Sequence, residues 1–85
     1  MKKQYEFSEK EIGMKIKSIM IVLGENIKKK RIEKNISRTE LAYDANTTEG
    51  MICNIENGKK LGITIYTLVK ISNALETTAK ELFCE

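Results

Sequence analysis

The sequence repeats one local signal, a Ser or Thr followed three residues later by Glu, and it contains no proline. In such a capping box the hydroxyl and the carboxylate each accept a hydrogen bond from a backbone N–H at the start of a helix. Proline is the residue that most strongly interrupts helices, so its absence favours them throughout. No β-type alternation of apolar and polar residues is sustained. We therefore predict an all-α fold, with capping boxes at Ser8–Glu11, Ser37–Glu40 and Thr78–Glu81 and further N-caps at Thr48 and Thr64.

Asn and Gly mark the ends of these helices, because both tolerate the left-handed backbone conformation that commonly follows a helix. We expect stops at Asn35 and at Asn57-Gly58, and a tight turn around Asn46-Thr47. The caps and stops together predict one long helix and four short ones, to within roughly 2–4 residues at each end. These helices cover residues 9–34, 38–45, 49–57, 65–75 and 79–83.

The composition excludes several functional classes. The 85 residues are enough for one hydrophobic core, and 41% hydrophobic with 32% charged residues is typical of a soluble globular protein. There is no histidine, and the two cysteines lack the spacing of a zinc site, so we expect no metal and no cofactor. No nucleophile, base and orienting group occur together, so we expect no enzyme.

No apolar run can span a membrane, and Met1-Lys2-Lys3 does not begin a secretory signal, which indicates a cytoplasmic protein with free thiols.

The predicted long helix carries two apolar faces. At about 100° per residue, six apolar side chains share one arc of about 100°, and a narrower apolar line lies on another side. A helix with two apolar faces usually has two partners. The second partner is either a neighbouring helix of the same chain or another molecule, and the pattern favours neither. The wide face contains Ile12, Ile16, Ile19, Met20, Leu23 and Ile27, and the narrow line contains Met14, Ile21 and Ile32.

Residues 37–60 contain two short predicted helices joined by a tight polar turn. This arrangement is typical of a helix-turn-helix, whose second helix enters the DNA major groove, although ordinary helical hairpins share it. In the second helix the side chains at 51, 52 and 55 point toward a core. The opposite face, an arc of about 140°, is polar or small and can approach a groove, whereas a merely solvated face would carry more Lys and Glu. We predict that this face reads base edges through Glu49, Gly50, Cys53 and Asn54.

Side chains suited to binding DNA phosphates surround this face. Hydroxyls and N–H groups at helix N-termini bind phosphate oxygens, and Lys and Arg neutralise their charge. The densest basic run, residues 28–31, radiates around its helix and is interpreted as a solvated face. The predicted phosphate contacts are Ser37, Arg38, Thr47, Thr48, Lys59 and Lys60.

From Leu23 to Phe83 the chain resembles the Cro and phage-repressor type of helix-turn-helix protein, the XRE family. Five ordered blocks carry the resemblance, which makes it far more specific than a lone pair of helices. They are L-G-E-N-I-K-K-K-R (23–31), S-R-T-E-L-A (37–42), M-I-C-N-I-E-N-G-K (51–59), L-V-K-I-S-N-A-L (68–75) and K-E-L-F (80–83). The resemblance implies a five-helix, lambda-repressor-like globule and a cytoplasmic, usually dimeric transcription regulator with residues 49–57 as its recognition helix.

The resemblance also implies roles for single residues. Arg31 and Glu56 match a pair that ties the first helix to the recognition helix, and we expect them to form a partly buried ion pair. Glu49 departs from the family pattern, because it places a negative charge where a polar or basic reader is usual. Arg38 stands where a Gln often touches phosphate and base, Thr48, Glu49, Gly50 and Asn54 stand at groove-facing positions, and Asn57 and Lys59 stand at backbone contacts.

The chain divides into an N-terminal extension, residues 1–22, helical from about residue 9, and a helix-turn-helix domain, residues 23–85.

The domain has ten Lys and Arg against nine Asp and Glu, so its electrostatic field is weak and a monomer should bind DNA feebly. We predict a homodimer that reads a palindromic operator in double-stranded DNA, joined through Ile12, Ile16 and Ile19 or, alternatively, through a Leu82-Phe83 patch. The rival hypothesis is a protein-interaction module of the antitoxin or anti-repressor type, with weak or no DNA binding.

Overall fold

The structure, a computed structural model, describes residues 8–85 and contains five helices in that range. They are α1 (Glu9–Glu33), α2 (Arg38–Asp44), α3 (Glu49–Glu56), α4 (Ile65–Ala74) and α5 (Ala79–Leu82). The predicted all-α, five-helix fold is confirmed, and each helix ends one residue earlier than predicted. Within residues 8–85 no helix combines the length and the apolar character needed to cross a membrane. The Met1-Lys2-Lys3 start of the predicted extension lies outside the described residues.

A side-chain hydrogen bond caps the start of each helix, and a left-handed residue follows the end of four of them. All five predicted N-caps accept a hydrogen bond from the backbone N–H three residues further on, at distances of 3.0–3.2 Å. Four helices are followed, two residues after their last residue, by a residue with positive φ, which allows two backbone N–H groups to reach the last carbonyls. Three of these residues, Asn35, Asn46 and Gly58, are of the expected types, and the fourth is Glu76 (φ 55°). Glu76 was not predicted as a stop, because its Cβ is disfavoured in this conformation.

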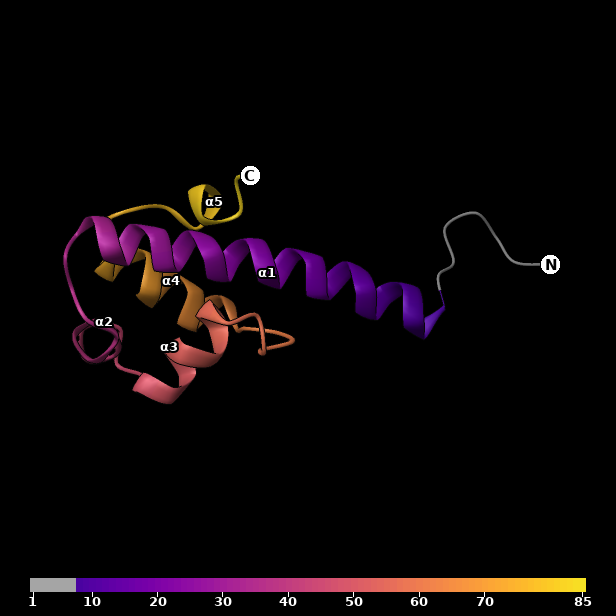
Figure 1. The fold of residues 1–85 in the computed structure, drawn as a ribbon, viewed down its shortest axis with the longest axis horizontal. Coiled ribbons are helices and arrows are strands. Elements are labelled where there is room, and N and C mark those ends of the chain that lie inside the picture. Colours follow the sequence, from indigo (N-terminus) through magenta and orange to yellow (C-terminus); the bar gives the residue numbers. More distant parts are fainter. Residues whose placement is uncertain (1–7) are drawn as a thin grey trace.

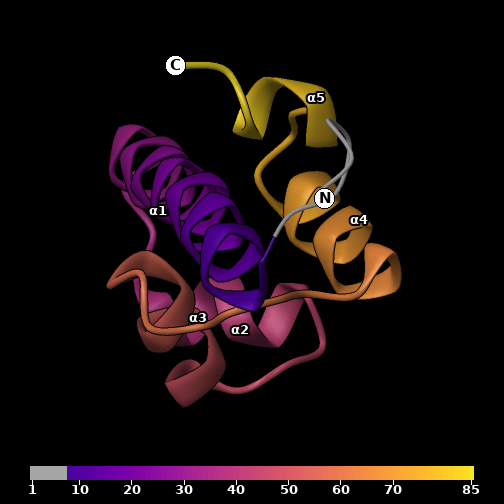
Figure 2. The ribbon, with the colours of Figure 1, turned by 90° about the vertical axis from the view of Figure 1, so that its right-hand side faces the viewer.

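The core lies where the C-terminal half of α1 meets the other helices. Gly24 of α1 faces the backbone of α3, so that a Cβ at this position would collide with the carbonyl oxygen of Ile55. This close approach lets the two helices pack backbone against backbone. Seen along α1, α3 lies on one side of it and α5 on another (Figure 2). The buried hydrophobic residues are Met20, Leu23, Ile27, Leu41, Ala42, Ala45, Ile52, Ile55, Leu68, Ile71, Leu75 and Leu82.

The N-terminal half of α1 projects beyond the other helices (Figure 1). The molecule measures 51 × 22 × 20 Å as a result, and every residue from 8 to 19 is exposed. The wide apolar face of α1 is therefore buried only in part. Met20, Leu23 and Ile27 lie in the core, whereas Ile12, Ile16 and Ile19 are 39%, 39% and 53% exposed. On the narrow apolar line, Met14, Ile21 and Ile32 are also exposed, and Ile21 lies next to Gly58.

Candidate nucleic-acid interface

The segment from α2 to α3 forms a compact helix-turn-helix. The Thr47 N–H donates to the Ala42 carbonyl at 2.9 Å across the left-handed Asn46, which reverses the chain directly after α2. Ala45 in this turn is fully buried, as are Ile52 and Ile55 of α3. Because these side chains anchor the inner face of α3 in the core, the opposite face of the helix points away from the protein.

That outward face carries the residues predicted to read bases. Glu49, Gly50 and Asn54 are exposed, and Cys53 is partly buried and has a free thiol. The Asn57 amide donates to the Cys53 sulfur at 3.4 Å, so these two side chains lie side by side along the helix. No bulky apolar side chain stands among these residues. The face therefore has the small, polar surface that a helix needs to enter a groove.

Glu49 is held by a contact that the sequence did not predict. The Thr39 hydroxyl of α2 donates to Glu49 Oε2 at 3.0 Å, which links the N-terminal ends of the two helices of the motif. Glu49 is also the first residue of α3, where the helix dipole stabilises a negative charge. Thr39 and Glu49 are ten residues apart, and no local pattern indicates that they meet.

A buried carboxylate joins α1, α2 and α3. Glu56 has a side-chain exposure of 0% and accepts from Arg31 Nε at 2.7 Å and from Arg31 Nη2 at 3.1 Å, so the expected ion pair is present. The third guanidinium nitrogen, Arg31 Nη1, donates to the Ile36 carbonyl at 3.0 Å. The hydrogen bond to Glu56 raises the pKa of Arg31 above its ordinary value; desolvation by burial opposes this rise, and Coulombic attraction to Glu56 adds to it.

Arg38 belongs to the same network, which the sequence did not indicate. Its Nε donates to Glu56 Oε1 at 3.0 Å, so one carboxylate serves two guanidinium groups. The Arg38 side chain is 34% exposed to solvent, compared with 11% for Arg31. Arg38 is therefore a partly exposed cation anchored to the last residue of α3.

The other predicted phosphate ligands lie around the ends of α2 and α3. Thr47 and Thr48 precede α3, while Asn57, Lys59 and Lys60 follow it, and Ser37 precedes α2. The hydroxyls of Ser37 and Thr48 accept cap hydrogen bonds and keep their own hydrogen for donation. Lys59 is exposed, and Lys60 is partly buried beside a hollow that Met51 also lines.

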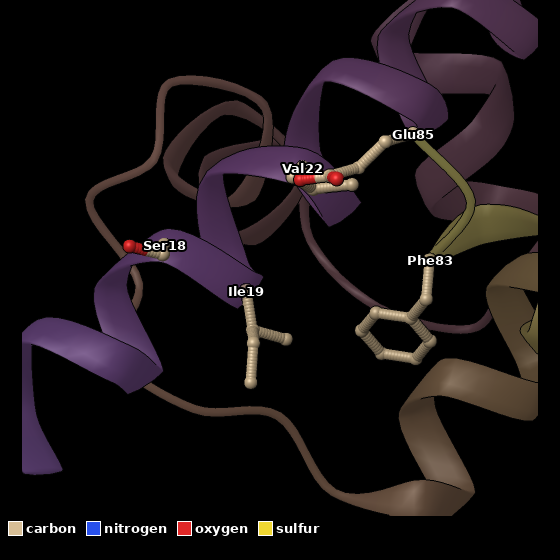
Figure 3. A pocket seen from close by; sticks show the side chains of 5 residues that line it. All are labelled: Ser18, Ile19, Val22, Phe83 and Glu85. Carbon is tan, nitrogen blue, oxygen red and sulfur yellow. The ribbon is translucent and has the colours of Figure 1, made fainter.

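A second surface lies at the base of the projecting helix. A groove of about 540 Å³ is lined by Ser18, Ile19, Val22, Phe83 and Glu85. Ile19 comes from α1, and Phe83 comes from the segment that follows α5 (Figure 3). Leu82 is fully buried, so the predicted Leu82-Phe83 patch is reduced to Phe83 alone. The Asn26 amide holds this C-terminal segment by donating to the carbonyls of Leu82 (2.8 Å) and Cys84 (2.7 Å).

A five-helix globule that presents the second helix of a capped pair is the fold of a helix-turn-helix DNA-binding regulator. Residues 24–84 match the profile of a helix-turn-helix domain family, and the chain belongs to the XRE-type helix-turn-helix family of transcription regulators. The predicted family is thereby confirmed, and it is one of regulators rather than enzymes. The lambda-repressor-like fold is confirmed by the solved structures to which this chain is similar.

Three solved structures are similar to this chain. The restriction-modification controller protein C.AhdI from Aeromonas hydrophila has 21% identity, and the match covers 78% of this chain and 98% of that one with a TM-score of 0.73. The clp gene regulator ClgR from C. glutamicum has 22% identity, 75% and 82% coverage and a TM-score of 0.69. A single-residue variant of the restriction-modification controller protein C.Esp1396I has 31% identity, 76% and 81% coverage and a TM-score of 0.69. No curated protein gives a significant match.

Proposed function

We propose that this regulator reads a palindromic operator as a homodimer, with α3 of each protomer in the major groove. The observation that carries the proposal is the outward face of α3, which is exposed and lined by Glu49, Gly50, Cys53 and Asn54. The Asn54 amide can donate and accept at once, as pairing with adenine requires. Two such helices about 34 Å apart would meet half-sites one turn of DNA apart.

The residues around the ends of α2 and α3 are proposed to bind the DNA backbone. Exposed Thr48 and Lys59 lie at opposite ends of α3, so they suit phosphates on the two sides of the groove. Arg38 would contribute its terminal nitrogens while its Nε stays bound to Glu56. The complete proposed backbone set is Ser37, Arg38, Thr47, Thr48, Asn57, Lys59 and Lys60.

The dimer is proposed to form through the projecting half of α1. Residues 9–19 are exposed and project beyond the other helices (Figure 1), and a helical segment of this length gains little stability in water without packing. Ile12, Ile16 and Ile19 line one side of this segment, and burial of exposed isoleucine favours association. We accordingly treat residues 1–22 as an extension and 23–85 as the domain, a division supported by a family match that begins at residue 24.

A salt titration tests DNA binding directly. The full chain is mixed with a random-sequence duplex at low salt, and the affinity is measured as the salt concentration rises. A DNA-binding protein should lose affinity with a log–log slope of about −0.9 for each phosphate contacted. The rival hypothesis, a protein-interaction module, is supported by Glu49 and by the near cancellation of charge over residues 23–85. Absence of binding at low salt, with the protein folded, would favour that rival.

A further inference from the structure

We propose that Thr39 positions Glu49 as a reader of cytosine, so that each operator half-site requires a C at the base pair facing the start of α3. This inference rests on the proposed function, since it presupposes that α3 enters the major groove. It concerns a contact between α2 and α3, from Thr39 Oγ1 to Glu49 Oε2 at 3.0 Å. It also assigns a positioning role to Thr39, a residue that makes no base contact itself.

The chemistry of the carboxylate selects the base. An ionised Glu only accepts hydrogen bonds. In the major groove, guanine presents two acceptors and thymine presents one acceptor and a methyl group, so both leave the carboxylate facing a group with which it cannot bond. Adenine places an acceptor beside its amino group, whereas cytosine offers an amino donor alone. Glu49 therefore repels guanine and thymine, and it favours cytosine over adenine because adenine sets an acceptor next to its donor.

The location of Glu49 allows it to make this contact. It is exposed and is the first residue of α3, and the N-terminal residues of recognition helices are those that meet base edges. The negative charge that is unusual for a DNA-binding face is favoured here by the dipole of α3 and by the Thr39 hydroxyl.

Thr39 restrains the Glu49 side chain before it contacts the base. An exposed Glu normally loses side-chain freedom when it binds, which weakens the net interaction. The hydroxyl occupies one lone pair of Oε2 and restrains the side chain before DNA arrives, while the remaining lone pairs can accept from a base.

Selection from a randomised duplex library, followed by sequencing, tests the inference with the full chain. Wild type should show one position in each half-site at which C is preferred over the other bases by about 5- to 150-fold. Glu49→Gln should lose that preference and gain one for A, since Gln pairs with adenine, while the other positions stay unchanged. Thr39→Val should weaken the C preference several-fold, and Thr39→Ser, which retains the hydroxyl, should restore it.

Each outcome separates this inference from the proposed function. If wild type selects an operator but Glu49→Gln selects the same one, the cytosine role of Glu49 is overturned and DNA reading by α3 stands. If Thr39→Val matches wild type at that position, the role of Thr39 is overturned. If wild type binds no duplex, both the inference and the proposed function are overturned. Thermal melting of each variant shows that it is folded, so a changed preference cannot be attributed to unfolding.

Discussion

Arg31 binds Glu56 through two parallel hydrogen bonds, of 2.7 and 3.1 Å, and the carboxylate that they hold is inaccessible to solvent. The pair connects the last turn of the long helix to the last residue of α3. The position of the recognition helix thus depends on a buried charge, and the loss of either partner leaves the other uncompensated.

We expect Glu56→Gln to destabilise the protein by about 3 kcal/mol or more, because it leaves the charges of Arg31 and Arg38 without their shared counter-ion. Urea denaturation measures the change. The matched control is Glu81→Gln, which removes an exposed ion pair with Lys30 (3.8 Å) and should cost less than about 1 kcal/mol. A similar small loss in both variants would contradict a structural role for the buried network.

The same pair should show little dependence on pH. The raised pKa of Arg31 means that its contribution to stability is present below the unfolded-state pKa and is lost only as pH rises through the folded-state value. Both values lie in strongly alkaline solution, since an arginine is protonated at any pH near neutrality. The free energy lost in Arg31→Met should therefore be equal at pH 6 and pH 9. A loss that halves over this interval would show that another titrating group controls the network.

Gly24→Ala should destabilise the protein even though alanine favours helices. Its Cβ would overlap the Ile55 carbonyl oxygen, so α1 and α3 must separate, and overpacking of this kind costs about 1–3 kcal/mol. Gly13→Ala is the matched control in the same helix, because nothing lies within 4 Å of a Cβ there. That variant should gain about 1 kcal/mol from helix propensity alone. Changes of the same sign in both variants would be inconsistent with the close approach.

Glu76→Gly should stabilise the protein by about 0.5–1 kcal/mol, because Glu76 adopts φ 55°, a conformation that costs a residue with a Cβ about 1–2 kcal/mol. Part of that gain is offset by the greater freedom of glycine in the unfolded chain. Glu76 also pairs with Lys34 at 3.1 Å, so Lys34→Met serves as the control that removes the ion pair alone. Thermal melting distinguishes the two. A lower melting temperature for Glu76→Gly would show that the ion pair outweighs the backbone strain.

The proposed dimer predicts that replacing Ile12, Ile16 and Ile19 together by Ser will yield a monomer in sedimentation equilibrium. The exposed apolar side chains of one face are then no longer available to a second copy. The control replaces exposed Met14 and Ile32, on the other side of α1, and should leave the mass unchanged. A dimer that survives the triple replacement would exclude this face and direct attention to the groove at Phe83.

Local chemistry was sufficient to place the helices and the helix-turn-helix. An N-cap acts on an N–H only three residues away, and a left-handed stop involves its immediate neighbours, so both can be recognised without knowledge of the fold. The same holds for the outward face of α3, which follows from helical periodicity. Among the left-handed helix stops in residues 8–85, only Glu76 escaped recognition, since nothing in its chemistry favours the conformation that it adopts.

Contacts between distant residues were decided by tertiary packing. Ile19 and Leu23 share one apolar face, but Leu23 is buried and Ile19 is exposed because the other helices cover only the C-terminal half of α1. The capture of Arg38 by Glu56 and the approach of Thr39 to Glu49 likewise join separate helices. Periodicity reports which side of a helix a residue occupies, but burial and pairing depend on what lies opposite, and that is defined only when the helices pack.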